Sequence, residues 1–264
     1  MTAPVIVAEG LTKRYGERSL AVDGIGLRVM AGTVFGLVGP NGAGKTTTLL
    51  MMVGALCPTA GTLDILGRPV GPDAVDIKAR LGYVPSDDRL FEHLTGEEQV
   101  LLSAIAYGVA SGVAQPRLRE LFDLLELGAD RGRRIREYSH GMKRKVSLAC
   151  ALVHGPDILF LDEPLEGLDV PTARVLKDTF RLMAERGKTL LLTSHNLSLI
   201  DDLCPRVAVM HHGRVLFDGP TEQLKGRAGE HAHDQLEDAF LAMIGHAGRT
   251  AGLSWITGGS AKEP

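Results

Sequence analysis

The sequence contains the stretch Gly39-Pro40-Asn41-Gly42-Ala43-Gly44-Lys45-Thr46-Thr47. It fits the phosphate-binding pattern G-x-x-x-x-G-K-[ST], in which glycines let consecutive backbone N–H groups surround a polyphosphate. Residues 33–38 before it form an apolar run that predicts a buried strand, and residues 47–53 after it predict a helix. The sequence therefore predicts a strand, a phosphate-binding loop and a helix in succession. A glycine-rich turn that ends in lysine by chance would lack these flanks.

Lys45 and Thr46 are the side chains of this loop that bear on its chemistry. An ammonium at position 45 can bridge β- and γ-phosphate oxygens, and a hydroxyl at position 46 can ligate the Mg²⁺ that accompanies ATP. The N-terminus of the following helix adds about half a positive charge. The loop therefore predicts binding of ATP together with Mg²⁺.

The composition is that of an ordinary soluble α/β protein. The chain has 264 residues, of which 44% are hydrophobic and 23% are charged. The net charge of -3 gives no reason to expect nucleic acid as a partner. Cys57, Cys150 and Cys204 are widely spaced, which predicts reduced thiols in a cytosolic compartment. No apolar run approaches the ~20 residues that a membrane span needs, so we expect a chain that does not cross the bilayer itself.

Several segments around the loop predict further elements. Residues 5–8, 20–29 and 62–67 predict an antiparallel flap, with Tyr15 in a polar turn where its ring could stack on a purine or simply be a half-buried hairpin aromatic. Residues 97–109 and 117–125 have helical spacing and predict a mostly helical insert. Its expected inward-facing residues are Leu101, Leu102, Ile105, Leu118, Leu121 and Leu125.

Two acids follow a continuous apolar run. Ile158-Leu159-Phe160-Leu161 predicts a strand buried on both faces, and Asp162-Glu163 then stand at its C-terminal end, where α/β sheets bind ligands. Asp169 is a candidate N-cap for a helix that extends to residue 186. Residues 189–193 predict another buried strand that presents Ser194-His195 at its end. Lys143-Arg144-Lys145 is a charged run that we expect to face solvent or a second subunit.

Taken in this order, the motifs resemble the ATP-binding subunit of ABC transporters over roughly residues 5–245. GPNGAGKTT resembles the Walker A loop and ILFLDEP the Walker B strand. Ser139-His140-Gly141-Met142 stands where the family has its signature, Gly167-Leu168-Asp169 matches the D-loop, and His195 and Tyr15 match the switch histidine and the aromatic loop.

The resemblance implies an α/β P-loop NTPase fold. We expect a RecA-like, mostly parallel core sheet, an antiparallel β flap and an α-helical subdomain inserted at about residues 87–150. The ATP-binding domain would span residues 1–245. Residues 246–264, rich in Gly, Ala, Ser and Thr, predict a flexible C-terminal tail.

The resemblance also implies site roles for ATP hydrolysis. Asp162 and Thr46 would hold Mg²⁺, Glu163 would act as the general base or orient the attacking water, and His195 would contact the γ-phosphate. The residues implied in nucleotide binding are Tyr15, the Walker A residues 39–47, Ser139, Gly141 and Asp169. Ser86 stands where the family usually has a glutamine that reaches Mg²⁺, so Asp87 or Asp88 is a candidate replacement.

The implied partners are a second ATP-binding subunit and a transmembrane permease. In the family the signature helix meets ATP held by the other subunit, which predicts a homodimer or heterodimer with ATP at the interface. The form Tyr-Ser-x-Gly-Met-Lys-x-[Lys/Arg] is similar to exporter subunits with separate permeases, so we expect export of a small molecule or peptide from a peripheral position on the cytoplasmic face of the membrane. The alternatives are a soluble ABC-type ATPase acting on ribosome or DNA, and a regulatory or immunity module with little turnover.

Overall fold

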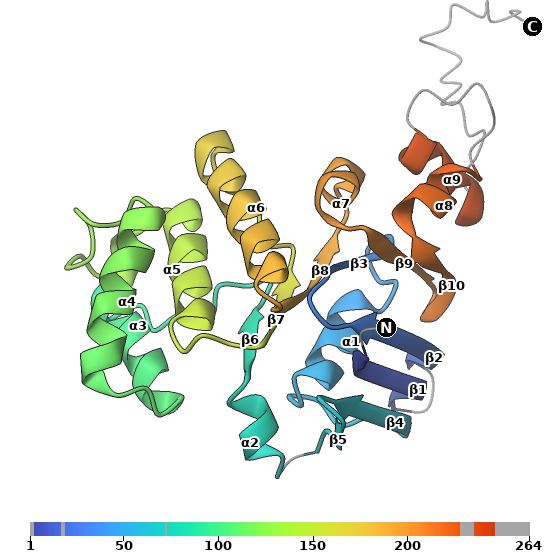
Figure 1. Cartoon of the computed structure of the whole chain (residues 1–264), viewed down its shortest axis with the longest axis horizontal. Coiled ribbons are helices and arrows are strands. Elements are labelled where there is room, and N and C mark those ends of the chain that lie inside the picture. The colour runs from blue at the N-terminus through green and yellow to red at the C-terminus, as the bar shows by residue number, and fades with distance from the viewer. Residues whose placement is uncertain (1–2, 17–18, 72, 228–234, 246–264) are drawn as a thin grey trace, which may run out of the picture.

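The computed structural model describes residues 3–16, 19–71, 73–227 and 235–245, and these residues form two sheets with helices around them (Figure 1). The larger sheet has the strand order β10-β9-β3-β8-β7-β6. Strands β6, β7, β8, β3 and β9 run parallel to one another, whereas β10 pairs antiparallel with β9. Its strands are β3 (Val34–Val38), β6 (Leu81–Val84), β7 (Ile158–Asp162), β8 (Thr189–Ser194), β9 (Arg206–His211) and β10 (Arg214–Pro220).

The central strands are buried along their whole length, as their apolar sequences predict. Every residue of β3, β7 and β8 is buried, because both faces of the sheet are covered, one of them by α1 together with the smaller sheet. In register, Val38 pairs with Ser194 and Asp162 pairs with Thr193. The C-terminal ends of three strands therefore lie level with one another, and the loops that follow them meet at one edge.

The smaller sheet is the predicted antiparallel flap. It has the order β2-β1-β4-β5, built from β1 (Pro4–Tyr15), β2 (Ser19–Met30), β4 (Ala60–Ile65) and β5 (Arg68–Pro69). Strand β1 pairs with β2 and also with the sequence-distant β4. The buried face of the flap packs in one apolar core with β3 and α1 (Lys45–Met52). The flap is thereby fixed against the phosphate-binding loop.

Helices occupy the connection between β6 and β7. They are α3 (Gly96–Ala106), α4 (Ser111–Leu124), the 3-10 turn η1 (Ile135–Glu137) and α5 (His140–Leu152). Figure 1 shows α3, α4 and α5 grouped on one side of the core sheet, with the flap on the other. Thr95 begins α3 with a capping box, and the Ser139 hydroxyl caps α5 by accepting from Met142 N at 3.2 Å. The helical character predicted for this region is observed, and its division into a separate subdomain stays a prediction.

The predicted inner face of α3 is wrong at two of its three positions: Leu101 packs partly buried against the core, but Leu102 and Ile105 are exposed. Leu102 and Ile105 are 41% and 71% exposed, whereas Val100 and Ala104 are fully buried. The helix is rotated because Gly96 lies against the ring of Tyr138: a Cβ at Gly96 would lie 2.4 Å from the Tyr138 hydroxyl oxygen. This close approach places positions 96, 100 and 104 on the inner side, so the spacing of large apolar residues misidentified the buried stripe.

The remaining helices complete the layers around the core sheet. They are α2 (Val75–Lys78), α6 (Val170–Glu185), α7 (Leu197–Leu203), α8 (Thr221–Lys225) and α9 (Gln235–Met243). Among the residues described, no helix has the length and apolar character required to cross a membrane. The predicted tail at residues 246–264 lies outside the described residues.

Candidate functional site

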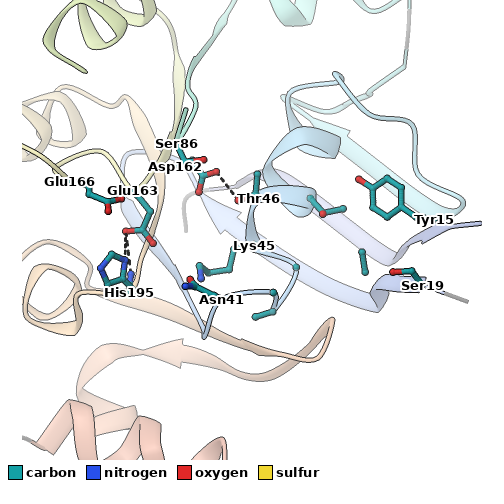
Figure 2. Close-up of a pocket in the computed structure, with 15 residues that line it drawn as sticks. Tyr15, Ser19, Asn41, Lys45, Thr46, Ser86, Asp162, Glu163, Glu166 and His195 are labelled. Atoms are coloured by element: carbon teal, nitrogen blue, oxygen red, sulfur yellow. Dashed lines mark hydrogen bonds and ion pairs between the residues drawn. The ribbon is translucent and has the colours of Figure 1, made fainter. Parts of the chain in front are cut away.

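A pocket of about 810 Å³ opens at the edge where β3, β7 and β8 end (Figure 2). The phosphate-binding loop forms one wall, the residues after β7 and β8 form another, and the flap closes one end. It is lined by Tyr15, Ser19, Ala21, residues 41–47, Ser86, Asp162, Glu163, Glu166 and His195. Sequence-distant residues that were predicted to act together therefore share one cavity.

The glycines of the loop are required by close backbone contacts. Gly44 has a left-handed φ of 104°, and a Cβ there would lie 2.4 Å from Ala21 O. A Cβ at Gly39 would lie 2.3 Å from Met210 O. Helix α1 begins directly after the loop, at Lys45. The loop therefore presents backbone N–H groups and a helix N-terminus to the pocket, which suits an anionic ligand.

Lys45 lies within the loop and is only 7% exposed. Its Nζ donates to Gly39 O at 2.6 Å and to Pro40 O at 3.3 Å. Burial lowers the pKa of this ammonium, while the nearby Glu163 and Asp162 oppose the shift. Gly39 and Pro40 do not line the pocket, but their carbonyls hold the charge at its wall. A bound polyphosphate would give that ammonium stronger, charged acceptors.

Asp162 is 1% exposed and is held by two hydroxyl groups. Thr46 Oγ1 donates to Asp162 Oδ2 at 2.8 Å (Figure 2). Thr193 Oγ1 donates to the other carboxylate oxygen, Asp162 Oδ1. A carboxylate oxygen and a hydroxyl oxygen thus lie side by side at the foot of the loop. Such hard oxygen donors fit Mg²⁺, which usually takes one or two protein oxygens and completes its shell with phosphate and water.

Glu163 is held at the edge of the pocket in a strained backbone conformation. Its φ of 51° is left-handed, and its backbone N–H donates to Thr193 O at 3.2 Å. The Glu163 side chain is 15% exposed. Its Oε2 lies 3.1 Å from His195 Nδ1 and accepts from the His195 backbone N–H at 3.3 Å (Figure 2). The carboxylate and the imidazole therefore meet in the same pocket as the phosphate-binding loop.

Tyr15 lies on the flap, at the end of the pocket away from the acids (Figure 2). It is 45% exposed, and Lys13 Nζ lies 5.4 Å from the ring centroid. A ring with an exposed face in this place suits stacking on a flat base.

Ser139, Gly141 and Asp169 do not line the pocket. They lie at the N-terminal ends of α5 and α6, where Ser139 and Asp169 are the N-caps; Asp169 Oδ1 accepts from Thr172 N at 2.8 Å. The two helix ends touch, since a Cβ at Gly141 would lie 2.9 Å from Gly167 O. These three residues therefore do not surround a nucleotide in the pocket of their own subunit.

The structure distinguishes the three candidates for the role that a glutamine usually has in the family. Ser86 lines the pocket. Asp87 does not line it; its side chain is 78% exposed and lies 3.8 Å from Arg89. Asp88 is 4% exposed and lies 3.4 Å from Arg144, and burial raises the pKa of this carboxyl against the effect of Arg144. Of these three residues, Ser86 is the one that lines the pocket.

We therefore expect Ser86→Ala to lower Mg²⁺-dependent ATP turnover by about 2- to 10-fold, the effect of losing one hydrogen bond. The neighbouring substitution Asp87→Ala is the matched control and should change turnover by less than about twofold, because its side chain faces solvent. Initial rates across a Mg²⁺ titration at saturating ATP measure both. A larger loss in Asp87→Ala would make Asp87 the metal-facing residue instead.

Arg144 is a site-associated residue that sequence reasoning missed. The charged run Lys143-Arg144-Lys145 was expected to face solvent or a second subunit, yet Arg144 is 1% and Lys145 8% exposed. Arg144 donates to the backbone carbonyls of Asp162 and Glu163, and Lys145 Nζ lies 3.5 Å from Asp169 Oδ2. The charge pattern alone does not distinguish a buried arginine from a solvated one. Thr193 was likewise read only as part of a strand.

Comparison with known proteins agrees with this geometry. A family profile described as ABC transporter matches residues 22–166. The chain belongs to the ABC transporter family. Nod factor export ATP-binding protein I of Paraburkholderia xenovorans is 38% identical over 224 residues, which cover 85% of this chain and 73% of that protein. Daunorubicin resistance ATP-binding protein DrrA3 of Streptomyces coeruleorubidus is 37% identical over 259 residues, covering 98% and 80%.

A solved structure of an ATP-binding subunit of an ABC transporter has the same fold. It superposes with a TM-score of 0.84 at 27% identity and covers 90% of this chain and 99% of that chain. The predicted P-loop α/β fold and the predicted ABC-transporter ATP-binding subunit are therefore confirmed. The chain is an ATP-binding ATPase subunit of this transporter family, and its pocket is where that activity is expected.

Proposed function

We propose that this ABC subunit hydrolyses ATP with Mg²⁺ in the pocket of Figure 2 and drives export through a separate transmembrane permease. One observation carries the proposal: a single cavity contains the phosphate-binding loop, the acid pair and His195. An aromatic ring for the base lies at one end, and a carboxylate with an imidazole lies at the other. The cavity thus has the order of groups that a nucleoside triphosphate requires.

The proposed reaction is in-line attack of water on the γ-phosphorus, which forms a new P–O bond, breaks the bond to the β–γ bridging oxygen and releases ADP and inorganic phosphate. The loop N–H groups, the N-terminus of α1 and Lys45 neutralise the phosphate charge. Thr46 and Asp162 would hold Mg²⁺, which would supply positive charge to the bound phosphates. Glu163 orients and deprotonates the water. His195, whose Nδ1 lies 3.1 Å from Glu163 Oε2, holds this carboxylate in place. The protein's main contribution is positioning, since phosphoryl transfer demands little covalent chemistry from it.

The proposed active unit is a head-to-tail dimer with a second ATP-binding subunit. Ser139, Gly141 and Asp169 lie outside the pocket, at neighbouring helix ends. Ser139 is exposed at the start of α5, so its helix N-terminus is open to an anion from outside the subunit. ATP bound by one subunit would be closed over by α5 of the other, and hydrolysis would release the pair.

The proposed cargo is a small molecule or peptide that the permease selects. One relative is named for export of Nod factor and another for resistance to daunorubicin, at 38% and 37% identity. Two relatives that are named for different compounds at nearly equal identity support the view that the partner, not this chain, contacts the cargo. The subunit would then lie on the cytoplasmic face of the membrane, attached to its permease.

Purification from membranes tests this proposal. The tagged chain, extracted from its native membranes with mild detergent, is expected to copurify with a protein that has several apolar segments of about 20 residues. Cargo added to the reconstituted complex in lipid vesicles should then stimulate ATP turnover. Copurification with ribosomes or DNA, and no association with a membrane protein, would favour a soluble ATPase and contradict the proposal.

A further inference from the structure

Arg144 places a full positive charge in the protein interior. It lies in α5, and its side chain is 1% exposed. An isolated buried charge is strongly unfavourable, so its partners indicate why it is there. Asp88, itself 4% exposed, supplies the opposite charge with Oδ1 3.4 Å from Arg144 Nη1. The second carboxylate oxygen of Asp88 has no hydrogen bond and lies 3.6 Å from His140 Nδ1.

The other partners of Arg144 are backbone carbonyl groups. A guanidinium carries five N–H donors in a fixed planar fork. Asp88 takes one, and the remaining acceptors match the remaining donors in number. They are the carbonyls of Pro85, Asp162 (2.5 Å), Glu163 (2.5 Å) and Pro164 (3.3 Å). Three of the four belong to consecutive residues that include both catalytic-site acids.

The backbone held in this way is strained. Glu163 has a φ of 51°. Residues other than glycine rarely adopt this backbone conformation, and it persists only where the surroundings impose it. Its N–H donates to the carbonyl and to the hydroxyl of Thr193, each at 3.2 Å. Its carbonyl accepts from Arg144. The two contacts fix the peptide groups on either side of the Glu163 Cα and therefore the direction in which its side chain leaves the backbone.

We propose that Arg144 is a positioning residue for ATP hydrolysis, which aims the Glu163 carboxylate by holding the Asp162 and Glu163 carbonyls. The inference rests on the proposed role of Glu163 toward the attacking water. Arg144 also holds the Pro85 carbonyl, next to Ser86 of the pocket, and shares its helix with the Ser139 N-cap. Arg144 therefore links α5 directly to the backbone of both acids.

The substitution Arg144→Lys tests the geometry while keeping the charge. Lysine offers three donors on a flexible stem and cannot reproduce the planar fork. We expect kcat to fall by about 10- to 100-fold, as small misplacements in a reacting site do, while KM for ATP changes by less than about twofold. The control is Arg117→Lys, because Arg117 Nη1 donates to the Val153 carbonyl at 3.0 Å, beyond the other end of α5. Equal kcat values in the two variants would overturn the proposal.

A double-mutant cycle separates this inference from the function on which it rests. If Arg144 acts through Glu163, Arg144→Lys should change the residual rate of Glu163→Gln by less than about twofold. Losses that multiply would show that Arg144 acts independently and would overturn its positioning role. Full hydrolysis in Glu163→Gln alone would instead contradict the proposed role of Glu163.

Folding is monitored by thermal unfolding and by ATP binding in the absence of Mg²⁺. Should Arg144→Lys fail to fold, Arg144→Gln/Asp88→Asn removes both buried charges together and leaves no unpaired ion. The same loss of kcat is expected from it. Wild-type kcat in this folded double variant would overturn the proposal.

Discussion

Glu163→Gln should lower ATP hydrolysis by about 10²–10⁴-fold while leaving ATP binding nearly unchanged. The amide keeps the size of the side chain and its contact with His195, now 3.1 Å from the Glu163 carboxylate. It cannot accept a proton from water, and it lacks the charge that orients the water. Single-turnover hydrolysis with radiolabelled ATP measures the loss, and calorimetry without Mg²⁺ measures binding.

The control for this substitution is Glu166→Gln, which removes the same charge from the same pocket. Figure 2 shows the contacts of His195 going to Glu163, not to Glu166, so a much smaller loss is expected in the control. Equal losses would mean that pocket charge, and not a specific base, controls the rate.

A second readout for Glu163→Gln is the assembly state: ATP should accumulate uncleaved in this variant and trap the head-to-tail dimer. A strictly monomeric ATP-bound variant would contradict the proposed composite site.

Lys45→Met should weaken ATP binding by about 10- to 100-fold, the range expected when hydrogen bonds to a charged group are lost. In the free protein Lys45 is 7% exposed, its ammonium donates to loop carbonyls, and burial lowers its pKa. A triphosphate would offer it negative oxygens and favour its charged form. Methionine fills similar volume without the burial cost of an ammonium, so the variant should remain folded.

The control for Lys45→Met is Lys188→Met. Lys188 pairs with Asp157 at 2.8 Å, before the start of β8 and thus at the opposite end of the sheet from the pocket. The substitution Lys188→Met removes one lysine charge from the protein but none from the pocket. Displacement of a fluorescent ATP analogue compares the two variants with the wild type. If both bind ATP as tightly as the wild type, the loop is not the phosphate site.

The fold was largely predictable because its signals are local. The apolar runs of β3, β7 and β8 and the glycine pattern between β3 and α1 depend on neighbours in the chain. The order of the motifs then indicated which segments share a site. Local spacing failed at α3, where large apolar residues suggested Leu102 and Ile105 as inner positions although both are exposed. There, the contact of Gly96 with the distant Tyr138 decides the orientation.

The sequence by itself determined the strand–loop–helix unit, the acid pair and the family. Only the tertiary structure decided that Ser86 faces the pocket while Asp87 faces solvent, and that Arg144 lies beneath the acids. The backbone acceptors of Arg144 are between 18 and 59 residues away in the chain. Arg144 is buried because these carbonyls converge on its side chain. The residues next to Arg144 in the sequence carry no signal of that convergence, since it depends on distant backbone groups.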